Sequence, residues 1–201
     1  MAIPQDTSLS ILLVHDQPEQ AHALQADLEA LGHPVLAVCP SGRQARWLRP
    51  SLRPDLALIK DRLADMDGLA AAQGLQRQGP LPVVLLLGPE RNGQGLGQAE
   101  GVYGCLPAAP SRELLGPALA SAWQAFQRAQ ELQGQVSGMR QGLAERKAIE
   151  RAKGIVMEQL GLDEAAAQAR LEQEAQSQGL SLAQMAEGVI VARSLSQARQ
   201  K

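Results

Sequence analysis

One apolar segment of the chain ends where a reactive side chain is usually found. In PDLALIKDRLADMDGL, residues 54–69, the apolar run 56–59 leads into Lys60, followed by Asp61 and two more aspartates beside a glycine turn. Ligand sites of open parallel sheets lie outside the carboxyl ends of the strands. An apolar strand that ends in an acidic loop therefore commonly delivers a carboxylate to a site. This strand delivers a lysine instead, and the other residues of the chain must explain why.

A second stretch, residues 140–153, is rich in positive charge. It holds five basic and two acidic residues, a local surplus of +3, and the basic residues are Arg140, Arg146, Lys147, Arg151 and Lys153. Such a patch on one helix suits the phosphates of RNA, which supply most non-specific affinity. A charge run alone is usually only a solvated helix face, so the charges by themselves leave both alternatives open.

The sequence lacks the residue patterns of an active site. His15, His22 and His33 form no metal or triad pattern, no serine lies in a nucleophile elbow, and no glycine loop is arranged to cradle phosphate. We therefore expect neither an enzyme nor a bound cofactor or metal. Cys39 and Cys105 are isolated and are expected to be buried reduced thiols, as in a cytoplasmic protein.

Composition and charge set broader limits. The chain of 201 residues is long enough for a genuine core, with 45% hydrophobic and 20% charged residues and a net charge of −2. That charge argues against a wholesale polyanion binder but leaves room for a local basic patch. No secretory signal is visible at the start, and the strongest apolar run, residues 83–87, is far too short to span a membrane.

Short apolar runs alternate with helical stretches over the first 120 residues. The predicted strands are residues 11–14, 35–38, 56–59, 83–87 and 102–106. Residues 18–31 and 69–78 have the pattern of helices, and Gly32 is a plausible cap for the first. Fully apolar strands alternating with helices predict an α/β fold, a doubly wound five-stranded parallel sheet, over residues 1–120.

Four of these stretches resemble the signature stretches of a response-regulator receiver domain. They are ILLVHDQPEQ, PDLALIKDRLADMDGL, LPVVLLLG and GVYGCLPAAP. In that family two adjacent acids and a strand-ending aspartate hold Mg²⁺ and accept a phosphoryl group, supported by a Thr or Ser and by a Lys-Pro pair. The corresponding positions here are His15, Asp16, Lys60, Leu87 and Ala108, and only Asp16 keeps the family's residue type.

The substitutions predict a degenerate phosphorylation site. Mg²⁺ requires oxygen ligands, which an ammonium group cannot supply, and Leu87 offers no hydroxyl to a phosphoryl group. We expect Lys60 to pair with Asp16 and to replace the metal. Two alternatives stay open. Lys60 could extend unpaired into solvent, or Asp61 could accept phosphate through a one-residue slip, which would reverse the face of each side chain.

A seam of apolar residues in steps of three and four runs through the second half. Its members are Leu115, Ala118, Ala122, Ala125, Ala129, Leu132, Val136, Met139 and Leu143. This spacing predicts a coiled-coil helix over residues 111–143 and a homodimer. The alternative is one long amphipathic helix folded back on its own domain. Gly134, Gly138 and Gly142 each weaken a helix by roughly 1 kcal/mol relative to Ala, and the sequence does not decide whether the helix continues through them.

Three short helices are predicted to finish the chain. The first ends at Gly161, the second has Asp163 as its N-cap, and the third begins with a capping box of Ser181 and Gln184.

The first of these helices contains ERKAIERAKGIVMEQLGL, residues 145–162, which resembles the ANTAR module of the AmiR and NasT transcription antitermination regulators. The matching positions are Ile149, Ala152, Lys153, Gly154, Met157, Ala167, Leu171, Ala175 and Ala186. The resemblance covers about residues 140–192 and implies a helical RNA-binding domain over residues 140–201.

By this resemblance the protein is an RNA-binding antiterminator that holds leader mRNA hairpins. Its control would come from a small-molecule-sensing regulatory protein, as in relatives with degenerate receivers. We expect the five basic residues of 140–153 to contact phosphates, Lys153 foremost, because Gly154 beside it lets a nucleic-acid backbone approach closely. The family often has an aromatic or His side chain where this chain has Gln168, and Arg170 is the expected stacking plane in its place.

The alternative is a DNA-binding response regulator in which the last two helices form a helix-turn-helix. A recognition helix should present readers of base edges and few acids. The outward positions of residues 181–195 include Glu187 and only one basic residue, Arg193. That surface is poorly suited to contacting base edges in a DNA groove.

Overall fold

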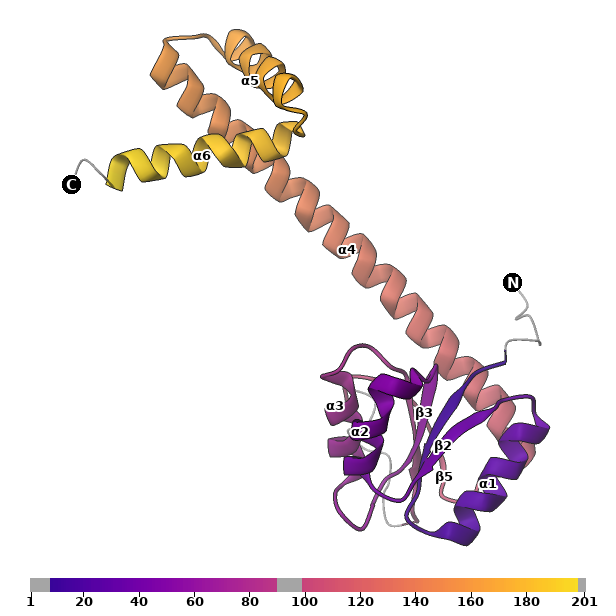
Figure 1. Cartoon of the computed structure of the whole chain (residues 1–201). Helices are drawn as coiled ribbons and strands as arrows, with labels where there is room; N and C mark the ends of the chain where they lie inside the picture. Colours follow the sequence, from indigo (N-terminus) through magenta and orange to yellow (C-terminus); the bar gives the residue numbers. More distant parts are fainter. Residues whose placement is uncertain (1–7, 90–98, 199–201) are drawn as a thin grey trace. The chain divides into compact units, whose positions relative to one another are not determined.

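The computed structural model describes residues 8–89 and 99–198 (Figure 1). The chain divides into two compact units, residues 1–130 and residues 131–201. Each unit has its own hydrophobic core. The finer boundaries expected from the sequence (1–120, 111–143 and 140–201) stay predictions.

The first unit is built on a parallel sheet. Its strands are β1 (Ile11–Val14), β2 (Val35–Cys39), β3 (Leu56–Lys60), β4 (Val83–Leu87) and β5 (Val102–Pro107). They are hydrogen-bonded in the order β2-β1-β3-β4-β5, and every pair is parallel. The predicted doubly wound α/β fold is confirmed, and it places the carboxyl ends of β1, β3 and β4 side by side.

Helices cover both faces of this sheet (Figure 1). They are α1 (Pro18–Ala30), α2 (Gly42–Leu52), α3 (Gly68–Gln76) and the start of α4 (Arg112–Leu160). Ile11 and Leu13 of β1 pack with residues of α1 and α4, whereas Leu12 and Val14 pack with residues of α2 and α3. Successive strand residues point to opposite faces, so the continuous apolar strands contribute side chains to two separate cores, one on each face of the sheet.

The sequence analysis did not delimit α2, which owes its position to contacts far along the chain. Ser41 caps its start by accepting a hydrogen bond from the Gln44 amide at 3.2 Å. Near its end the buried Arg49 side chain donates to the carbonyl oxygens of Leu75 and Gly79. A buried guanidinium requires such acceptors. These oxygens lie near the end of α3 and just beyond it, so the periodicity of apolar residues in α2 does not reveal them.

The loop after β3 is fixed by Gly68. Its amide donates to the carbonyl oxygen of Asp61 at 2.6 Å, and a Cβ atom at Gly68 would collide with the backbone oxygen of Lys60. Only glycine permits this approach. Asp67 then caps α3 by accepting from the Leu69 amide at 2.8 Å. The turn therefore holds the end of β3, and with it Lys60, in one conformation.

The second unit consists of the end of α4, α5 (Glu164–Gln178) and α6 (Leu182–Ala198). Its buried residues are Ala152, Val156, Ala167, Leu171, Ala175, Met185 and Ala186. Asp163 caps α5, and Ser181 and Gln184 exchange the reciprocal hydrogen bonds of a capping box, as predicted. The predicted first short helix is the end of α4, which continues through Gly134, Gly138 and Gly142.

The cysteines differ from expectation in one case. Cys39 is buried at the end of β2, and this burial raises the pKa of its thiol to about 11, whereas Cys105 on β5 is exposed. β5 is the last strand in the order of the sheet. None of the helices in the described part of the chain is both long and apolar enough to cross a membrane.

Candidate functional site

Lys60 and Asp16 form the ion pair that the sequence predicted. The Lys60 Nζ donates to Asp16 Oδ1 at 2.7 Å, and the two side chains are only 17% and 18% exposed. Burial acts to raise the pKa of Asp16, but the hydrogen bond and the positive charge of Lys60 outweigh it and hold that pKa below its usual value. Asp16 is therefore an ionised carboxylate that is already satisfied by a cation from the same chain.

The sheet brings the pair together. β1 and β3 are neighbours, with Val14 opposite Ile59, so the residues that follow Val14 lie beside the last residue of β3. Asp61 lies elsewhere: it is 3% exposed, its amide donates to the Leu86 carbonyl oxygen at 2.9 Å, and its carboxylate oxygens lie 3.8 Å from where a Cβ on Gly88 would be. Lys60, not Asp61, occupies the position next to Asp16, and its side chain does not extend unpaired into solvent.

His15 is buried beside this pair. Its Nδ1 accepts a hydrogen bond from the Gln17 amide at 3.2 Å, and its Nε2 has no hydrogen-bond partner within the part of the chain that the structure describes. Burial, and then the charge of Lys60, lower the pKa of His15. The imidazole is therefore neutral at pH 7 and adds no charge to the site.

The residues present do not fit a magnesium ion. Mg²⁺ needs an octahedron of oxygen atoms. Among the positions expected to supply carboxylates, only Asp16 has one, and that carboxylate is paired with the ammonium group of Lys60. Across residues 8–89 and 99–198, no three His, Cys, Asp or Glu side chains are arranged to hold a metal. Leu87 ends β4 and Ala108 follows β5 without offering a hydroxyl or a cation.

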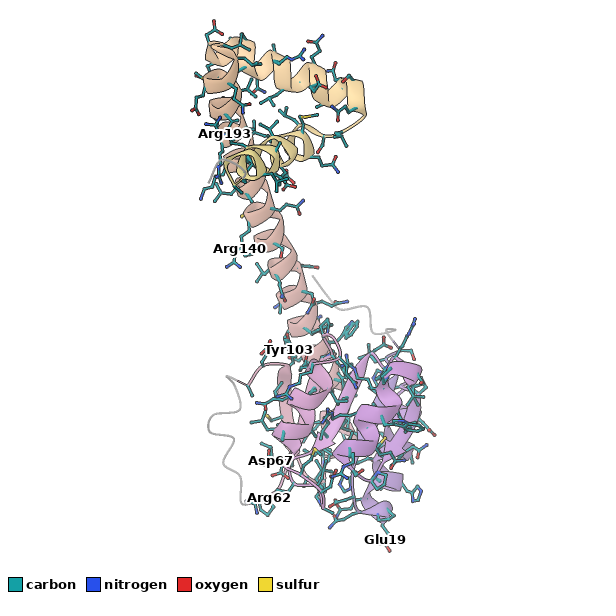
Figure 2. All side chains as sticks on the ribbon, turned by 60° about the vertical axis from the view of Figure 1, so that its left-hand side comes forward. Glu19, Arg62, Asp67, Tyr103, Arg140 and Arg193 are labelled. Carbon is teal, nitrogen blue, oxygen red and sulfur yellow. The ribbon has the colours of Figure 1, made fainter. Side chains whose placement is uncertain are left out.

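Three basic residues of α4 share one side of the helix. At about 100° per residue, Arg140, Lys147 and Arg151 lie within about 40° of one another and opposite the buried Ala152 and Val156. All three are exposed, and Figure 2 shows Arg140 projecting from the helix. Within the described ranges none of the three side chains takes part in a hydrogen bond or ion pair. We call these three residues the basic face.

Two other residues that were predicted to contact RNA, Arg146 and Gly154, lie near the basic face. Arg146 is exposed on a different side of α4. Gly154 is exposed beside the basic face, and a Cβ there would meet no atom within 4 Å. The chain's own packing in this unit therefore leaves room for a larger residue at position 154.

Lys153, which the sequence favoured most as a phosphate contact, has a different environment. It is 9% exposed, and its Nζ lies 2.8 Å from carboxylate oxygens of both Glu150 and Glu164. Hydrogen bonds to these two carboxylates raise the pKa of Lys153. Residue 153 lies beside core positions 152 and 156 on the helix, and its ion pair with Glu164 links α4 to α5. A contact between Lys153 and phosphate stays a prediction.

The residue predicted to stack on an RNA base, Arg170, lies on α5. Arg170 is exposed and lies 3.4 Å from Glu174, one turn further along the helix. Gln168 donates to Glu172 at 2.6 Å and is half-buried. Both residues are on α5, and Arg170 is the more accessible of the two.

Four members of the predicted heptad seam are strongly exposed in the single chain. Leu132, Val136, Met139 and Leu143 are between 48% and 74% exposed. The next two positions in the same spacing are Arg146 and Glu150, so the apolar seam ends at residue 143. These four residues form the exposed seam referred to below.

The helical unit matches a known domain. A sequence model described as "ANTAR domain" matches residues 137–190, which include the basic face and the core of the three helices. Residues 137–190 are an ANTAR domain. It follows a receiver-like domain in the same chain, as the sequence analysis expected.

Known proteins resemble both parts of the chain. Transcriptional regulatory protein PdtaR of Mycobacterium tuberculosis is 25% identical over 181 residues, which cover 90% of this chain and 88% of PdtaR. Phyllosphere-induced regulator PhyR of Methylorubrum extorquens is 36% identical over 89 residues, 43% of this chain and 33% of PhyR. A signal receiver domain of a modulated diguanylate cyclase from Desulfovibrio desulfuricans G20 superposes with a TM-score of 0.55 and 26% identity, covering 61% of this chain and 99% of that domain.

The sequence analysis missed the acidic partners inside the ANTAR domain. Glu150 and Glu164 hold Lys153, and Glu158 accepts a hydrogen bond from Arg193 of α6 at 2.8 Å. The spacing of Glu150 and Lys153, three residues apart, is a signal for the first of these pairs. The other two join different helices, and no local spacing reveals them.

Proposed function

We propose that this protein is an RNA-binding transcription antitermination regulator that acts on nascent leader RNA. The observation that carries the proposal is the basic face of the ANTAR domain. Arg140, Lys147 and Arg151 are exposed, carry no intramolecular partner among the described residues, and lie on the side of α4 opposite the core. Free cations arranged along one side of a helix suit a phosphate backbone.

The target that we favour is an RNA hairpin in the leader, held in a form that prevents the terminator from forming. RNA loops are recognised largely by stacking of unpaired bases on aromatic or guanidinium planes. The exposed Arg170 is our candidate for such a plane, with its contact to Glu174 exchanged for a base. Lys153 serves this function indirectly, because its ion pairs join α4 to α5.

A DNA-binding regulator is the weaker alternative. Arg193, the basic residue on the outward positions of α6, donates to Glu158 of α4. A cation engaged in this way is a poor reader of base edges. The basic face lies on α4, which is not one of the two helices that a helix-turn-helix would use.

The active form that we propose is a homodimer joined along α4. The exposed seam has the spacing of a two-stranded coiled coil, and side chains such as Met139, 74% exposed, are a liability in a monomer. Pairing two copies would bury the seam and would provide two basic faces for one RNA. The protein would act in the cytoplasm, where nascent transcripts are made.

Control of this dimer, in our proposal, comes from a small-molecule-sensing partner protein and not from phosphorylation. The Lys60–Asp16 pair takes the place of the metal, and Lys60, Leu87 and Ala108 occupy the positions where the receiver family has its acceptor carboxylate, its hydroxyl and its second cation. Treatment of the full-length protein with acetyl phosphate and Mg²⁺, followed by intact-mass measurement, should leave the mass unchanged. A stable adduct of one phosphate that disappears in Asp61→Asn would reject this part of the proposal.

The RNA contact is tested by binding across a salt series. The probe is an RNA of two stem-loops joined by a short spacer, with a duplex DNA of matching sequence as the comparison. Arg140→Ala, Lys147→Ala and Arg151→Ala should each lower the slope of log affinity against log salt by about 0.7–0.9. Arg128→Ala is the matched control, because Arg128 is exposed on α4 outside the ANTAR domain. Wild-type slopes in all three variants would contradict the proposed face, and tighter binding of the DNA would favour the alternative.

A further inference from the structure

Trp47 differs from every other aromatic residue of the chain. The chain has one Phe, one Tyr and two Trp. Three of these pack together: the ring centre of Phe126 lies 5.5 Å from that of Tyr103 and 5.7 Å from that of Trp123. Trp47 on α2 is instead 77% exposed. A protein that places its other aromatic rings against one another thus leaves one of its two indole rings facing solvent.

The surroundings of Trp47 are basic. Residues 41–54 contain four Arg and neither Asp nor Glu, although the whole chain has a net charge of −2. Arg43 and Pro50 lie one helical turn before and after Trp47, and Arg46 lies one turn before Pro50, so these residues adjoin on the outward side of α2. Arg53 follows at the end of the helix.

Three of these arginines are free to bind a ligand. Arg43, Arg46 and Arg53 are exposed, and over the described ranges their guanidinium groups take part in no hydrogen bond or ion pair. Arg49 differs, because it is buried and donates to backbone carbonyl oxygens. Asp65, in the loop after β3, contacts the start of α2. Its carboxylate accepts hydrogen bonds from the amides of Gly42 and Arg43 at 3.1 Å and is thus already engaged.

Arg46 is held in place by its aliphatic stem. A Cβ atom at Gly74 of α3 would lie 2.7 Å from Arg46 Cδ, so the absence of a side chain at Gly74 makes room for this stem. An arginine fixed in this way loses less freedom when it binds than one that is free along its whole length. The patch is therefore partly organised before any ligand arrives.

We propose that the outward side of α2 binds single-stranded RNA, with a base stacked on Trp47 and phosphates paired with Arg43, Arg46 and Arg53. An aromatic plane flanked by cations is the usual surface for single strands, because every base has a flat face and every linkage a negative charge. This site lies in the receiver-like unit. It is separate from the hairpin contact that we propose for the ANTAR domain and does not depend on it.

An acidic protein segment fits the patch less well. Tryptophan hot spots in protein interfaces lie in desolvated pockets surrounded by further contacts. Arg43 and Gln44 lie one helical turn before Trp47, and Pro50 and Ser51 lie one turn after it. The other large exposed apolar residues described in the receiver-like unit, Leu36 and Leu114, belong to other elements. The ring thus stands alone among charges, an arrangement suited to stacking a base.

The fluorescence of Trp47 provides the test. In full-length Trp123→Phe, Trp47 is the sole tryptophan, and in Trp47→Phe, Trp123 is. Titration with oligouridylate, which forms no hairpin, should quench the emission of Trp123→Phe and leave that of Trp47→Phe unchanged, because Trp123 packs against Phe126. Unchanged emission of Trp123→Phe, at RNA concentrations where anisotropy of labelled RNA shows binding, would overturn the proposal.

Affinity measurements divide the patch into its parts. Trp47→Ala should weaken oligouridylate binding roughly 5- to 150-fold with little change in the salt slope, since the loss is one stacked base. The double variant Arg43→Ala/Arg46→Ala should lower the slope by about 1.4. Arg128→Ala is the control for charge alone, and thermal unfolding of each variant checks that the fold is intact.

Two further results would overturn the proposal. One is equal quenching of Trp47 by oligouridylate and by an acidic peptide such as oligoglutamate, which would identify an acidic protein as the partner. The other is normal oligouridylate affinity in Trp47→Ala. Stem-loop binding that is lost in basic-face variants while Trp47 still responds to oligouridylate would separate this site from the ANTAR domain contact and would support it.

Discussion

Lys60 of the receiver-like unit and Lys153 of the ANTAR domain have a similar environment. Each lies at a position where the sequence leads one to expect chemistry, and each is held by carboxylates of its own chain at 2.7–2.8 Å. Arg140, Lys147 and Arg151 on the basic face are exposed and have no such partner among the described residues. The contrast separates cations that maintain the structure from cations that are available to a ligand.

The difference shows that the position of a charge on its element matters more than its presence in a motif. Lys60 ends a strand next to the end of β1, so a carboxylate is within reach. Lys153 lies beside core positions on α4, so its side chain turns toward α5. The basic face lies on the side of α4 away from the core, and within residues 8–89 and 99–198 no side chain pairs with its cations.

The largest effect should come from breaking the exposed seam, since two basic faces require two copies. Leu132→Glu combined with Met139→Glu would place unpaired charges between the helices and should convert the dimer to monomers. Ser137→Glu, an exposed change off the seam, is the control and should leave the dimer intact. The measurement is sedimentation at micromolar concentration, and a monomeric wild type would reject the dimer.

The pair in the receiver-like unit should show the next largest effect. Lys60→Ala leaves the Asp16 carboxylate without its hydrogen bond and should lower the free energy of unfolding by about 1–3 kcal/mol. Asp16→Ala and the double variant complete a cycle that isolates the coupling between the two side chains. Urea unfolding measures each value, and a coupling near zero would contradict a structural role for the pair.

Two lysines of the same helix sharpen the comparison further. Lys147→Ala should lower the salt slope of RNA binding by about 0.7–0.9 and leave stability within about 0.5 kcal/mol of wild type. Lys153→Ala should do the reverse: the unfolding midpoint falls because the link to Glu164 is lost, and the salt slope is retained. The opposite pattern in these two matched variants would mean that we have exchanged their roles.

The smallest effect concerns pH. Burial, then the charge of Lys60, lower the pKa of His15 in the folded protein, so the unfolded chain, with a histidine pKa of about 6.5, takes up a proton first. Stability should therefore fall as the pH drops below about 6.5. Burial lowers the pKa of His33 too, so its contribution has the same sign.

The variants His15→Gln and His33→Gln divide this pH dependence. Each should flatten part of the decline in thermal stability between about pH 7.5 and 5.5, and the double variant should flatten most of it. The stability that ionised Asp16 supplies is lost only at lower pH, below its ordinary pKa of about 3.9, because its own pKa is lowered. A full wild-type slope in His15→Gln would show that the buried imidazole does not titrate in this range.

The sequence was sufficient for features that depend on local pattern or on sheet order. The apolar runs predicted the five strands, Asp163 and the Ser181–Gln184 box marked helix starts, and the ends of β1 and β3 implied the Lys60–Asp16 pair.

Features that depend on distant contacts were not predicted. α2 contains Pro50 and four charged or polar side chains at its exposed positions, and carbonyl oxygens beyond α3 hold its Arg49. The ion pairs of Lys153 were not predicted because a charge count ignores the side of the helix on which each charge lies. Trp47 was overlooked because exposure is a property of the folded unit and not of the motif.

In the homodimer that we propose, the three glycines of α4 would couple winding of the helix to assembly. Gly134, Gly138 and Gly142 recur at every fourth residue, and a Cβ at any of them would meet no atom within 4 Å. Each costs about 1 kcal/mol of helix stability relative to Ala, and an isolated helix in water is already marginal. In the proposed dimer the seam supplies the missing stability from the opposite side, so this stretch winds as the copies meet and frays as they part. In such a dimer the concentration of the protein would set how much of this stretch of α4 is helical.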